Sequence, residues 1–352
     1  MTTFDVEAAR EVRVISAQGI GNTVLALPAL LDLKRAMPRA RITLLTQARD
    51  ATQAGLFGLA EPIDRALAVP SWAGLPGFLR ALGGRPDLTL VTFPHGRASA
   101  GLAALLGGWR VGHVDDGLHR WGRWLYDVRV PVDRALHDLD QNRALVRALG
   151  IETGRDPRCA FRFPDSEAAR VRECLRLGDA PLLAIHAGCS PAFPEKRWPA
   201  GRFGEVAASL AREAGLRAVV LGGPGEEGLT AEVRAAAGEA SVSAMDLSLV
   251  ERAALLSAAR LFVGNDSGMM NLAVALGVPT VGVFGPSEWA RSAPAGARSR
   301  TVRLGLDCSP CWGLASPPAC VHGSPRCMED LPVAPVLDAA RELLALPREA
   351  AP

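Results

Sequence analysis

The feature that most constrains the fold is a three-part unit near the start of the chain. A short β-branched run covers residues 12–17, the glycine turn QGIGNT follows at 18–23, and an apolar pattern typical of a helix covers 24–36. A strand, a glycine turn and a helix in this order open a doubly wound α/β domain. The sequence therefore predicts a parallel sheet covered by helices.

The alternation of strand and helix patterns continues along the chain in two series. After the opening unit, the first series has expected strands at 41–46, 63–69, 88–93 and 110–114, and an expected helix around 139–149. The second series has expected strands at 182–186, 217–221, 261–263 and 280–284, with helices at 200–214, 226–237, 249–259 and 269–276. Such alternation is typical of parallel sheets, so we expect an α/β protein with two Rossmann-like domains.

A turn-rich stretch at about 155–166 is the expected linker between the two series. We place an N-terminal domain at 1–160, a C-terminal domain at 161–332, and a final helix and tail at 333–352. Ligands of open parallel sheets bind at the carboxyl ends of the strands, and two sheets facing a central cleft would enclose a ligand there. This arrangement favours a nucleotide-dependent enzyme, although a fold alone does not establish a function.

Length, composition and charge narrow the class of protein. A chain of 352 residues with 49% apolar and 22% charged residues can form two globular cores. The net charge of +2 argues against a nucleic-acid partner. The first ten residues carry Asp5 and Glu7 and lack the apolar core of a signal peptide, and no apolar run approaches the ~20 residues that span a bilayer. We therefore expect a cytoplasmic protein.

The turn GNDSG at 264–268 is a candidate anion site. It follows an apolar strand and precedes a helix, so its backbone amides and the Ser267 hydroxyl can donate to a diphosphate. The alternative is that Asp266 only caps the helix.

Lys196 is a candidate phosphate contact because the chain contains only one other lysine, Lys34, and uses arginine elsewhere. It belongs to the segment EKRWP at 195–199, which follows HAGCS at 186–190 at the end of a predicted strand. An ammonium group can neutralise a phosphate, and the Ser190 hydroxyl can donate to one. The alternative is a solvated surface lysine.

The segment LGGPGEE at 221–227 ends the next predicted strand. Its glycines permit close approach of a flat ligand, and a carboxylate there can accept hydrogen bonds from ribose hydroxyls. The alternative is a glycine turn with glutamates that cap the helix.

Four segments together resemble glycosyltransferase family 9, the heptosyltransferase family with the two-domain GT-B fold. They are GIGNTVLALPAL, EKRWP, LGGPGEE and VGNDSGMMNLAVALGVPTVGVFGP, and the last is the most specific. The resemblance implies an inverting enzyme of hexosyl or heptosyl transfer, which moves heptose from ADP-heptose to a lipopolysaccharide inner-core or related glycan acceptor. It implies no cofactor or bound metal for catalysis, and an acceptor linked to lipid.

The resemblance also implies roles for individual residues. Lys196 would be catalytic and contact phosphate, and Glu226, or else Glu227, would contact the nucleoside. The implied donor-binding residues are Ser190, Lys196, Glu226, Asp266, Ser267, Gly268 and Asn271. The acceptor-side residues are Gly21, Asn22, His95 and Arg97.

Two positions depart from the family pattern. Asn22 stands where the family has the aspartate implied as general base, and Asn271 stands where histidine is common. An amide takes no proton at neutral pH, and loss of a general base typically costs about 10²–10⁴ in rate.

Three explanations of Asn22 are open. Another group acts as base, the donor or acceptor differs, or the protein binds a sugar nucleotide without turnover. The candidate replacement bases are His95, His113, Asp115 and Asp116. A nucleotide-sugar epimerase is a further alternative, which the stretch 263–286 disfavours.

Four cysteines, Cys308, Cys311, Cys320 and Cys327, lie within twenty residues. Thiolates so grouped can bind one Zn²⁺ or iron ion as a structural site. The alternative is a set of reduced thiols packed in a proline-rich loop.

The segment LHRWGRWLY at 118–126 interleaves cations and aromatic residues in the acceptor domain. It could rest on the inner face of the membrane, or form an ordinary half-buried amphipathic helix. The segment PHGRAS at 94–99 could contact the acceptor or only cap the next helix.

Overall fold

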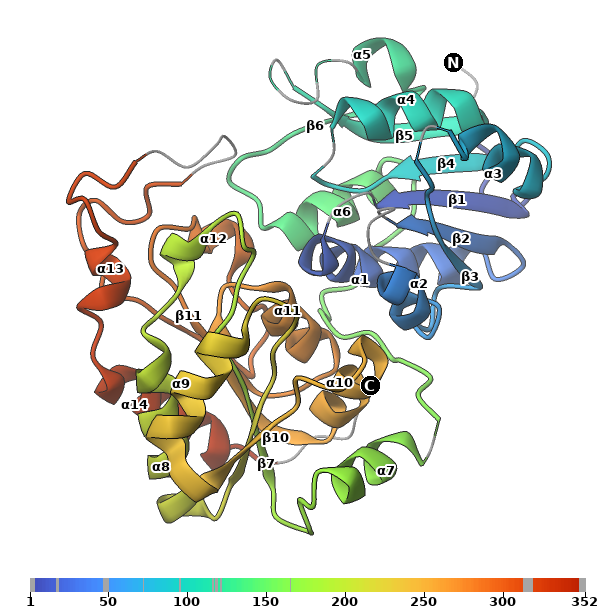
Figure 1. Ribbon diagram of the computed structural model, residues 1–352. Helices are drawn as coiled ribbons and strands as arrows, with labels where there is room; N and C mark the ends of the chain where they lie inside the picture. The colour runs from blue at the N-terminus through green and yellow to red at the C-terminus, as the bar shows by residue number, and fades with distance from the viewer. Residues whose placement is uncertain are drawn as a thin grey trace. The chain divides into compact units, whose positions relative to one another are not determined.

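A computed structural model shows a chain that divides into two compact units, Met1–Arg162 and Phe163–Pro352. Each unit is a parallel sheet with helices packed on it (Figure 1). The structure describes residues 4–16, 19–46, 51–71, 73–94, 96–115, 117, 120, 122–164, 166–312 and 319–347. Within these residues, none of the helices combines the length and apolar character that spanning a membrane requires.

The first unit contains six parallel strands in the order β3-β2-β1-β4-β5-β6. Their bounds are β1 (Glu11–Ser16), β2 (Arg41–Thr46), β3 (Arg65–Ala68), β4 (Leu88–Val91), β5 (Trp109–Val114) and β6 (Val128–Pro131). The helices are α1 (Ile20–Ala36), α2 (Ala51–Phe57), α3 (Leu75–Ala81), α4 (Arg97–Leu106), α5 (Gly122–Leu125) and α6 (Asp138–Arg147). Helices α1 and α6 pack side by side (Figure 1).

The second unit repeats this topology with the order β12-β11-β10-β7-β8-β9. Its strands are β7 (Leu182–His186), β8 (Arg217–Val220), β9 (Ser241–Ser243), β10 (Ala259–Asn265), β11 (Thr280–Val283) and β12 (Ser299–Val302). Its helices are α7 (Glu167–Cys174), η1 (Pro194–Lys196), α8 (Ala200–Ala214), α9 (Glu227–Ala237), η2 (Gly238–Ala240), α10 (Leu249–Ser257), α11 (Gly268–Ala275), α12 (Trp289–Ser292), α13 (Arg326–Glu329) and α14 (Val333–Ala345). Helix α14 packs on α8, β10, β11 and β12 and so belongs to the core of this unit.

The central strands are apolar because helices cover both faces of the sheet. In the first unit, Val14 of β1 pairs with Leu44 of β2 on one side and Leu90 of β4 on the other. In the second unit, Val263 of β10 lies in the same way between β7 and β11, and its side chain is fully buried.

This topology fixes where a ligand can bind. In each sheet the chain winds outward in one direction from the first strand and then returns to wind outward in the other. The loops after the two central strands therefore diverge at the carboxyl edge of the sheet and leave a crevice between them. In the first unit these loops follow β1 and β4, and in the second unit they follow β7 and β10.

The structure corrects two expectations. The sequence patterns missed the edge strands β6, β9 and β12, because an edge strand is short and partly exposed and lacks a continuous apolar run. The helix expected from residue 24 begins at Ile20, so residues 20–23 of the expected glycine turn belong to α1. Pro28 lies inside this helix.

Candidate functional site

The loops after β7 and β10 bring two predicted donor-site residues into direct contact. Lys196 ends the short helix η1, and its Nζ lies 2.5 Å from Oδ2 of Asp266, which stands between β10 and α11. The side chains are 18% and 8% exposed, respectively. Lys196 is therefore a fixed charge at the crevice of the second sheet and not a freely solvated surface lysine.

Two aromatic rings enclose the same ammonium group. Lys196 Nζ lies 5.9 Å from the ring centre of Phe193 and 5.4 Å from that of Trp312. Both distances are within the range of cation–π attraction. The rings contact each other edge to face, with centres 5.2 Å apart. They restrict the directions in which the ammonium group can move when it meets an anion.

A buried asparagine holds the Lys196 loop against the sheet. The Asn265 side chain accepts a hydrogen bond from the Trp198 backbone N–H at 3.0 Å and donates to the Ala187 carbonyl at 2.7 Å. The Trp198 ring is fully buried, and its Nε1 donates to Leu331 O at 2.9 Å. These bonds connect β10 to both ends of the loop that carries Lys196.

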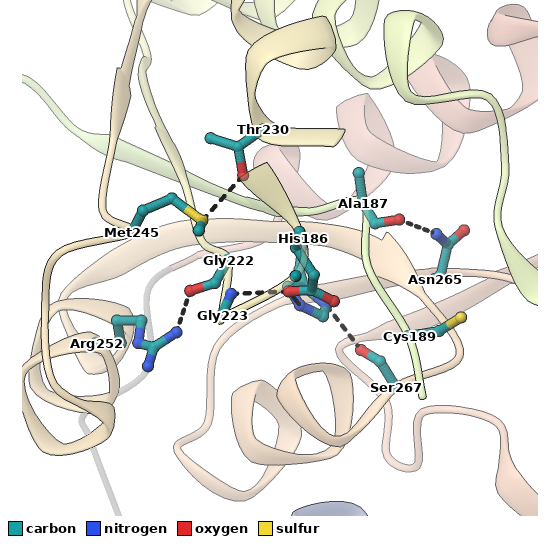
Figure 2. A network of polar contacts seen from close by, with 12 residues as sticks. His186, Ala187, Cys189, Gly222, Gly223, Thr230, Met245, Arg252, Asn265 and Ser267 are labelled. Atoms are coloured by element: carbon teal, nitrogen blue, oxygen red, sulfur yellow. Dashed lines mark hydrogen bonds and ion pairs between the residues drawn. The ribbon is translucent and has the colours of Figure 1, made fainter. Parts of the chain in front are cut away.

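His186, the last residue of β7, links two further predicted donor-site residues. Its Nδ1 lies 3.1 Å from Ser267 Oγ, and its Nε2 lies 3.3 Å from Glu226 Oε2. Ser267 is the N-cap of α11, and its Oγ accepts a bond from the Met270 N–H at 3.4 Å. Figure 2 shows this network together with the neighbouring turn at Gly222 and Gly223.

Glu226 is held as a carboxylate that points into this network. Burial alone would raise its pKa, but the hydrogen bond with His186, the charge that His186 carries when it is protonated, and the hydrogen bond from the Gly223 N–H outweigh burial and lower the pKa. The Gly223 N–H donates to Glu226 Oε2 at 2.8 Å. Glu227, by contrast, is exposed and accepts a bond from the Gly225 N–H. The geometry thus favours Glu226 over Glu227 as the nucleoside contact.

A glycine makes this orientation of Glu226 possible. A Cβ atom at Gly188 would collide with the Glu226 carboxylate. The φ angle of Gly188 does not lie in the left-handed region, so the residue is required by the close approach and not by its backbone conformation.

The remaining donor-side residues lie around the same crevice. Ser190 is exposed, Gly268 is half-buried as the first residue of α11, and Asn271 is 8% exposed within that helix. Cys189, the neighbour of Ser190, is buried and its thiol donates to Phe193 O at 3.2 Å. Burial raises the pKa of the Cys189 thiol, which makes it a packing group and not a thiolate.

The turn after β8, which contains Gly222 and Gly223, is held by further polar contacts. Arg252 of α10 donates to the Gly222 carbonyl, and Thr230 donates to the Met245 sulfur at 3.3 Å (Figure 2). A Cβ at Gly222 would meet the Met245 sulfur, so this glycine allows Met245 to pack against the backbone of the turn.

In the first unit, the predicted acceptor-side residues lie at the carboxyl edge of the sheet. Gly21 and Asn22 are half-buried in the first turn of α1, which follows β1. Arg97 is the first residue of α4, which follows β4. These positions flank the crevice of the first sheet. His95 lies outside the described residues.

The structure decides between some of the candidate replacement bases. His113 is fully buried, and its two ring nitrogens lie 3.2 and 3.0 Å from the backbone carbonyls of Val130 and Gln141. Because both nitrogens are occupied inside the core, the prediction of His113 as base is wrong. Asp115 follows β5 at the carboxyl edge and accepts a bond from the Gly117 N–H at 2.9 Å. Asp116 lies outside the described residues.

The four cysteines of the predicted metal site all lie in the described part of the chain. Among the described residues, no three His, Cys, Asp or Glu side chains stand where they could hold one ion. Cys311 is exposed, whereas burial, assisted by the neighbouring cysteines, raises the pKa of Cys327 to about 11. The Cys320 thiol donates to Ser324 O at 2.9 Å. A structural metal at these thiols stays a prediction.

The sequence interpretation missed His186 and Asn265 as site residues. Each is a polar residue at the carboxyl end of a buried central strand, and each is less than 10% exposed. A polar side chain in that position would have been a usable signal, because buried polar groups require partners.

This chain is similar in sequence and in fold to known heptosyltransferases. The sequence profile of glycosyltransferase family 9 (heptosyltransferase) matches residues 84–322. Lipopolysaccharide heptosyltransferase 2 of Escherichia coli strain K12 is 32% identical over 211 residues, which cover 56% of this chain and 58% of that protein. The chain spans about half the length of the curated relatives it matches.

Two solved structures share the fold. The family 9 glycosyl transferase from Veillonella parvula matches with a TM-score of 0.79 at 20% identity, over 97% of this chain and 99% of that one. ADP-heptose lps heptosyltransferase II of E. coli matches with a TM-score of 0.75 at 20% identity, over 95% and 98%. The expected GT-B fold is thus confirmed, and since the family profile covers more than half of the sequence, this chain belongs to glycosyltransferase family 9, the heptosyltransferase family.

Proposed function

We propose that this protein is an inverting glycosyltransferase that transfers heptose from ADP-heptose to a lipopolysaccharide inner-core or related glycan acceptor. The observation that carries the proposal is the contact of Lys196 with Asp266 next to the N-terminus of α11, on a chain of the heptosyltransferase family. A fixed ammonium group beside the backbone amides of a helix N-terminus suits a diphosphate.

The donor would lie on the second unit. Lys196 and the amides at Ser267 and Gly268 would stabilise the negative charge that develops on the leaving diphosphate. Glu226 would accept hydrogen bonds from the ribose hydroxyls, because its carboxylate is ionised and fixed at the turn after β8. Asp266 would orient Lys196, and Asn271 and Ser190 would border the sugar and the phosphates.

The acceptor hydroxyl would be presented by the first unit, near Asn22 and Arg97. The hydroxyl attacks the anomeric carbon on the face opposite the leaving group, which inverts that centre. Asn22 would orient the hydroxyl through its amide while another group accepts the proton. Asp115 is the described candidate for that group, since its carboxylate lies at the carboxyl edge after β5.

A second candidate function rests on Asn22. With Asn22 in place of a carboxylate, the protein would bind a sugar nucleotide without transferring the sugar. This reading predicts tight binding of ADP and no turnover with any glycan acceptor.

The deciding experiment is calorimetric titration with ADP, UDP and GDP, followed by a transfer assay with ADP-heptose and a truncated inner-core acceptor. Selective binding of ADP with formation of the extended glycan is the expected result. Preference for UDP or GDP would contradict the proposed donor. Binding of ADP without formation of product would favour the second candidate function, in which the protein binds a sugar nucleotide and does not transfer the sugar.

We also propose that the first unit contacts the inner face of the membrane. Trp124 of α5 is 75% exposed and Leu105 of α4 is 59% exposed, and Arg123 adjoins Trp124 in the sequence. Exposed apolar side chains beside a cation suit an anionic lipid surface. Sedimentation with vesicles containing phosphatidylglycerol should capture the wild type and release Trp124→Ala. Equal capture of both proteins would contradict this contact.

A further inference from the structure

The hydrogen bonds around His186 fix which of its nitrogens carries a proton. Glu226 accepts a hydrogen bond from the Gly223 N–H at 2.8 Å, and a carboxylate can only accept hydrogen bonds. The Nε2 atom of His186, which faces Glu226 Oε2 at 3.3 Å, must therefore be the donor. In the neutral imidazole, Nδ1 is then an acceptor.

This tautomer determines where the Ser267 hydroxyl hydrogen points. With Nδ1 as acceptor, the contact of 3.1 Å between His186 and Ser267 requires the hydroxyl to donate toward the imidazole. The Ser267 oxygen also accepts from the Met270 N–H. The hydroxyl then has no hydrogen left for another partner and offers only a lone pair, which repels a phosphate oxygen.

A second proton on His186 reverses this arrangement. Nδ1 would become a donor to Ser267 Oγ, and the hydroxyl hydrogen would be free to turn toward a ligand. The hydroxyl would then suit an anion. The positive imidazolium would remain paired with Glu226, whose carboxylate is only 13% exposed.

Other charged and titratable groups surround this position. Asp266 is paired with Lys196, and Arg197 and His186 both act on the pKa of Glu226. Glu226 is the charged group in direct contact with His186. The charged and titratable groups of the neighbouring loops and helices are Asp266, Lys196, Arg197, Arg252 and Cys189. Since Asp266 and Lys196 neutralise each other, an incoming diphosphate adds net negative charge, which favours protonation of a histidine nearby.

We propose that His186 is a positioning residue that takes up one proton from solvent when the diphosphate of a sugar nucleotide binds, and thereby turns the Ser267 hydroxyl toward a phosphate oxygen. This inference rests on the proposed function, because it requires an anionic nucleotide beside α11.

The test is calorimetric titration of the full chain with ADP-heptose, without acceptor, in buffers of different ionisation enthalpy at pH 7.5. Both phosphates of this ligand are diesters that do not titrate near neutrality, so any proton uptake comes from the protein. The slope of the binding enthalpy against the buffer ionisation enthalpy gives the number of protons. We expect uptake approaching one proton, and an affinity that falls by up to about tenfold for each pH unit above neutrality.

The variant His186→Gln tests whether the proton is taken up by His186 itself. A glutamine amide can donate to Glu226 and accept from Ser267 as the neutral imidazole does, but it cannot be protonated. Uptake should vanish in this variant and persist in His137→Gln, which changes the N-cap of α6 in the first unit.

The outcomes separate the two proposals. Binding of ADP-heptose by the wild type without proton uptake overturns the role of His186 and leaves the proposed function standing. Unchanged uptake in His186→Gln also overturns that role. If ADP-heptose does not bind at all, the proposed function fails, and the inference fails with it. The wild-type measurement decides even if His186→Gln does not fold.

Discussion

Lys196 and Asp266 form an ion pair of 2.5 Å across the crevice of the second sheet, although 70 residues separate them in the sequence. Each comes from the loop after a different central strand. The pair holds a cation beside the N-terminus of α11, where backbone amides also attract anions. This contact is the basis of the donor site proposed above.

Replacing this lysine should weaken donor binding. Lys196→Ala removes a charge-assisted contact worth about 1.5–3 kcal/mol, so we expect the affinity for ADP to fall roughly 10- to 100-fold in calorimetry. Lys34→Ala is the matched control. Lys34 pairs with Asp64 in the first unit at 2.7 Å, so its loss should leave ADP affinity unchanged. If Lys196→Ala and wild type bound ADP with equal affinity, Lys196 would not be part of the donor site.

Adding one methyl group at Gly188 should displace Glu226. The backbone there accepts alanine, so the main effect of Gly188→Ala is rotation of the Glu226 carboxylate away from His186. We expect roughly tenfold weaker ADP binding, and a melting temperature at pH 7 that falls about as far as in Glu226→Gln. Gly228→Ala, two residues beyond Glu226 and with open space at its Cβ, should retain wild-type affinity. A wild-type Kd for Gly188→Ala would show that the position of Glu226 does not affect the nucleotide.

A carboxylate at residue 22 tests whether another group already acts as the general base. If Asp115 accepts the proton, as proposed above, a second carboxylate in Asn22→Asp adds little to the rate. The measurement is kcat in the ADP-heptose transfer assay, and we expect kcat and ADP affinity close to wild type. A general base contributes about 10²–10⁴ in rate where no other base acts, so a rise of that size would show that the wild-type protein lacks one.

Glu226 should make stability depend on pH at the acidic end. Its carboxyl has a lowered pKa in the folded protein, so it stabilises the fold above its unfolded-state pKa and loses this contribution as pH falls through the folded value. We expect the melting temperature of wild type to exceed that of Glu226→Gln at pH 7. The gap should close between roughly pH 5 and pH 3. A gap that stays constant over this range would argue against an ionised, paired Glu226.

Asn265 should contribute to both stability and binding. Its side chain is fully buried, and Asn265→Ala leaves the Trp198 N–H and the Ala187 carbonyl without partners. Each unsatisfied group costs about 1–3 kcal/mol in the free energy of unfolding, measured by denaturant titration. ADP affinity should fall as well. Asn142→Ala removes a comparable buried asparagine from the first unit and should destabilise without changing ADP affinity. Unchanged ADP affinity in Asn265→Ala would show that Asn265 does not support the site.

The alternation of strands and helices and the positions of the central strands were predictable from local patterns. Central strands form apolar runs because both of their faces are buried, and the glycine turns after them mark the carboxyl edge. The turn at 264–268 and the isolated Lys196 led to the proposed donor site because they follow such strands. The edge strand β9 was missed because its three residues are too few to show a periodic pattern.

The sequence by itself determined two doubly wound units, the glycine turns at their crevices, and the residue types that suit a diphosphate. Only the tertiary structure decided which side chains meet. His186 and Ser267 are 81 residues apart, and their contact depends on the parallel register of β7 and β10. The tertiary structure likewise placed His113 in the core. Local patterns encode burial and turns, whereas contacts between distant loops arise from how strands align in the sheet.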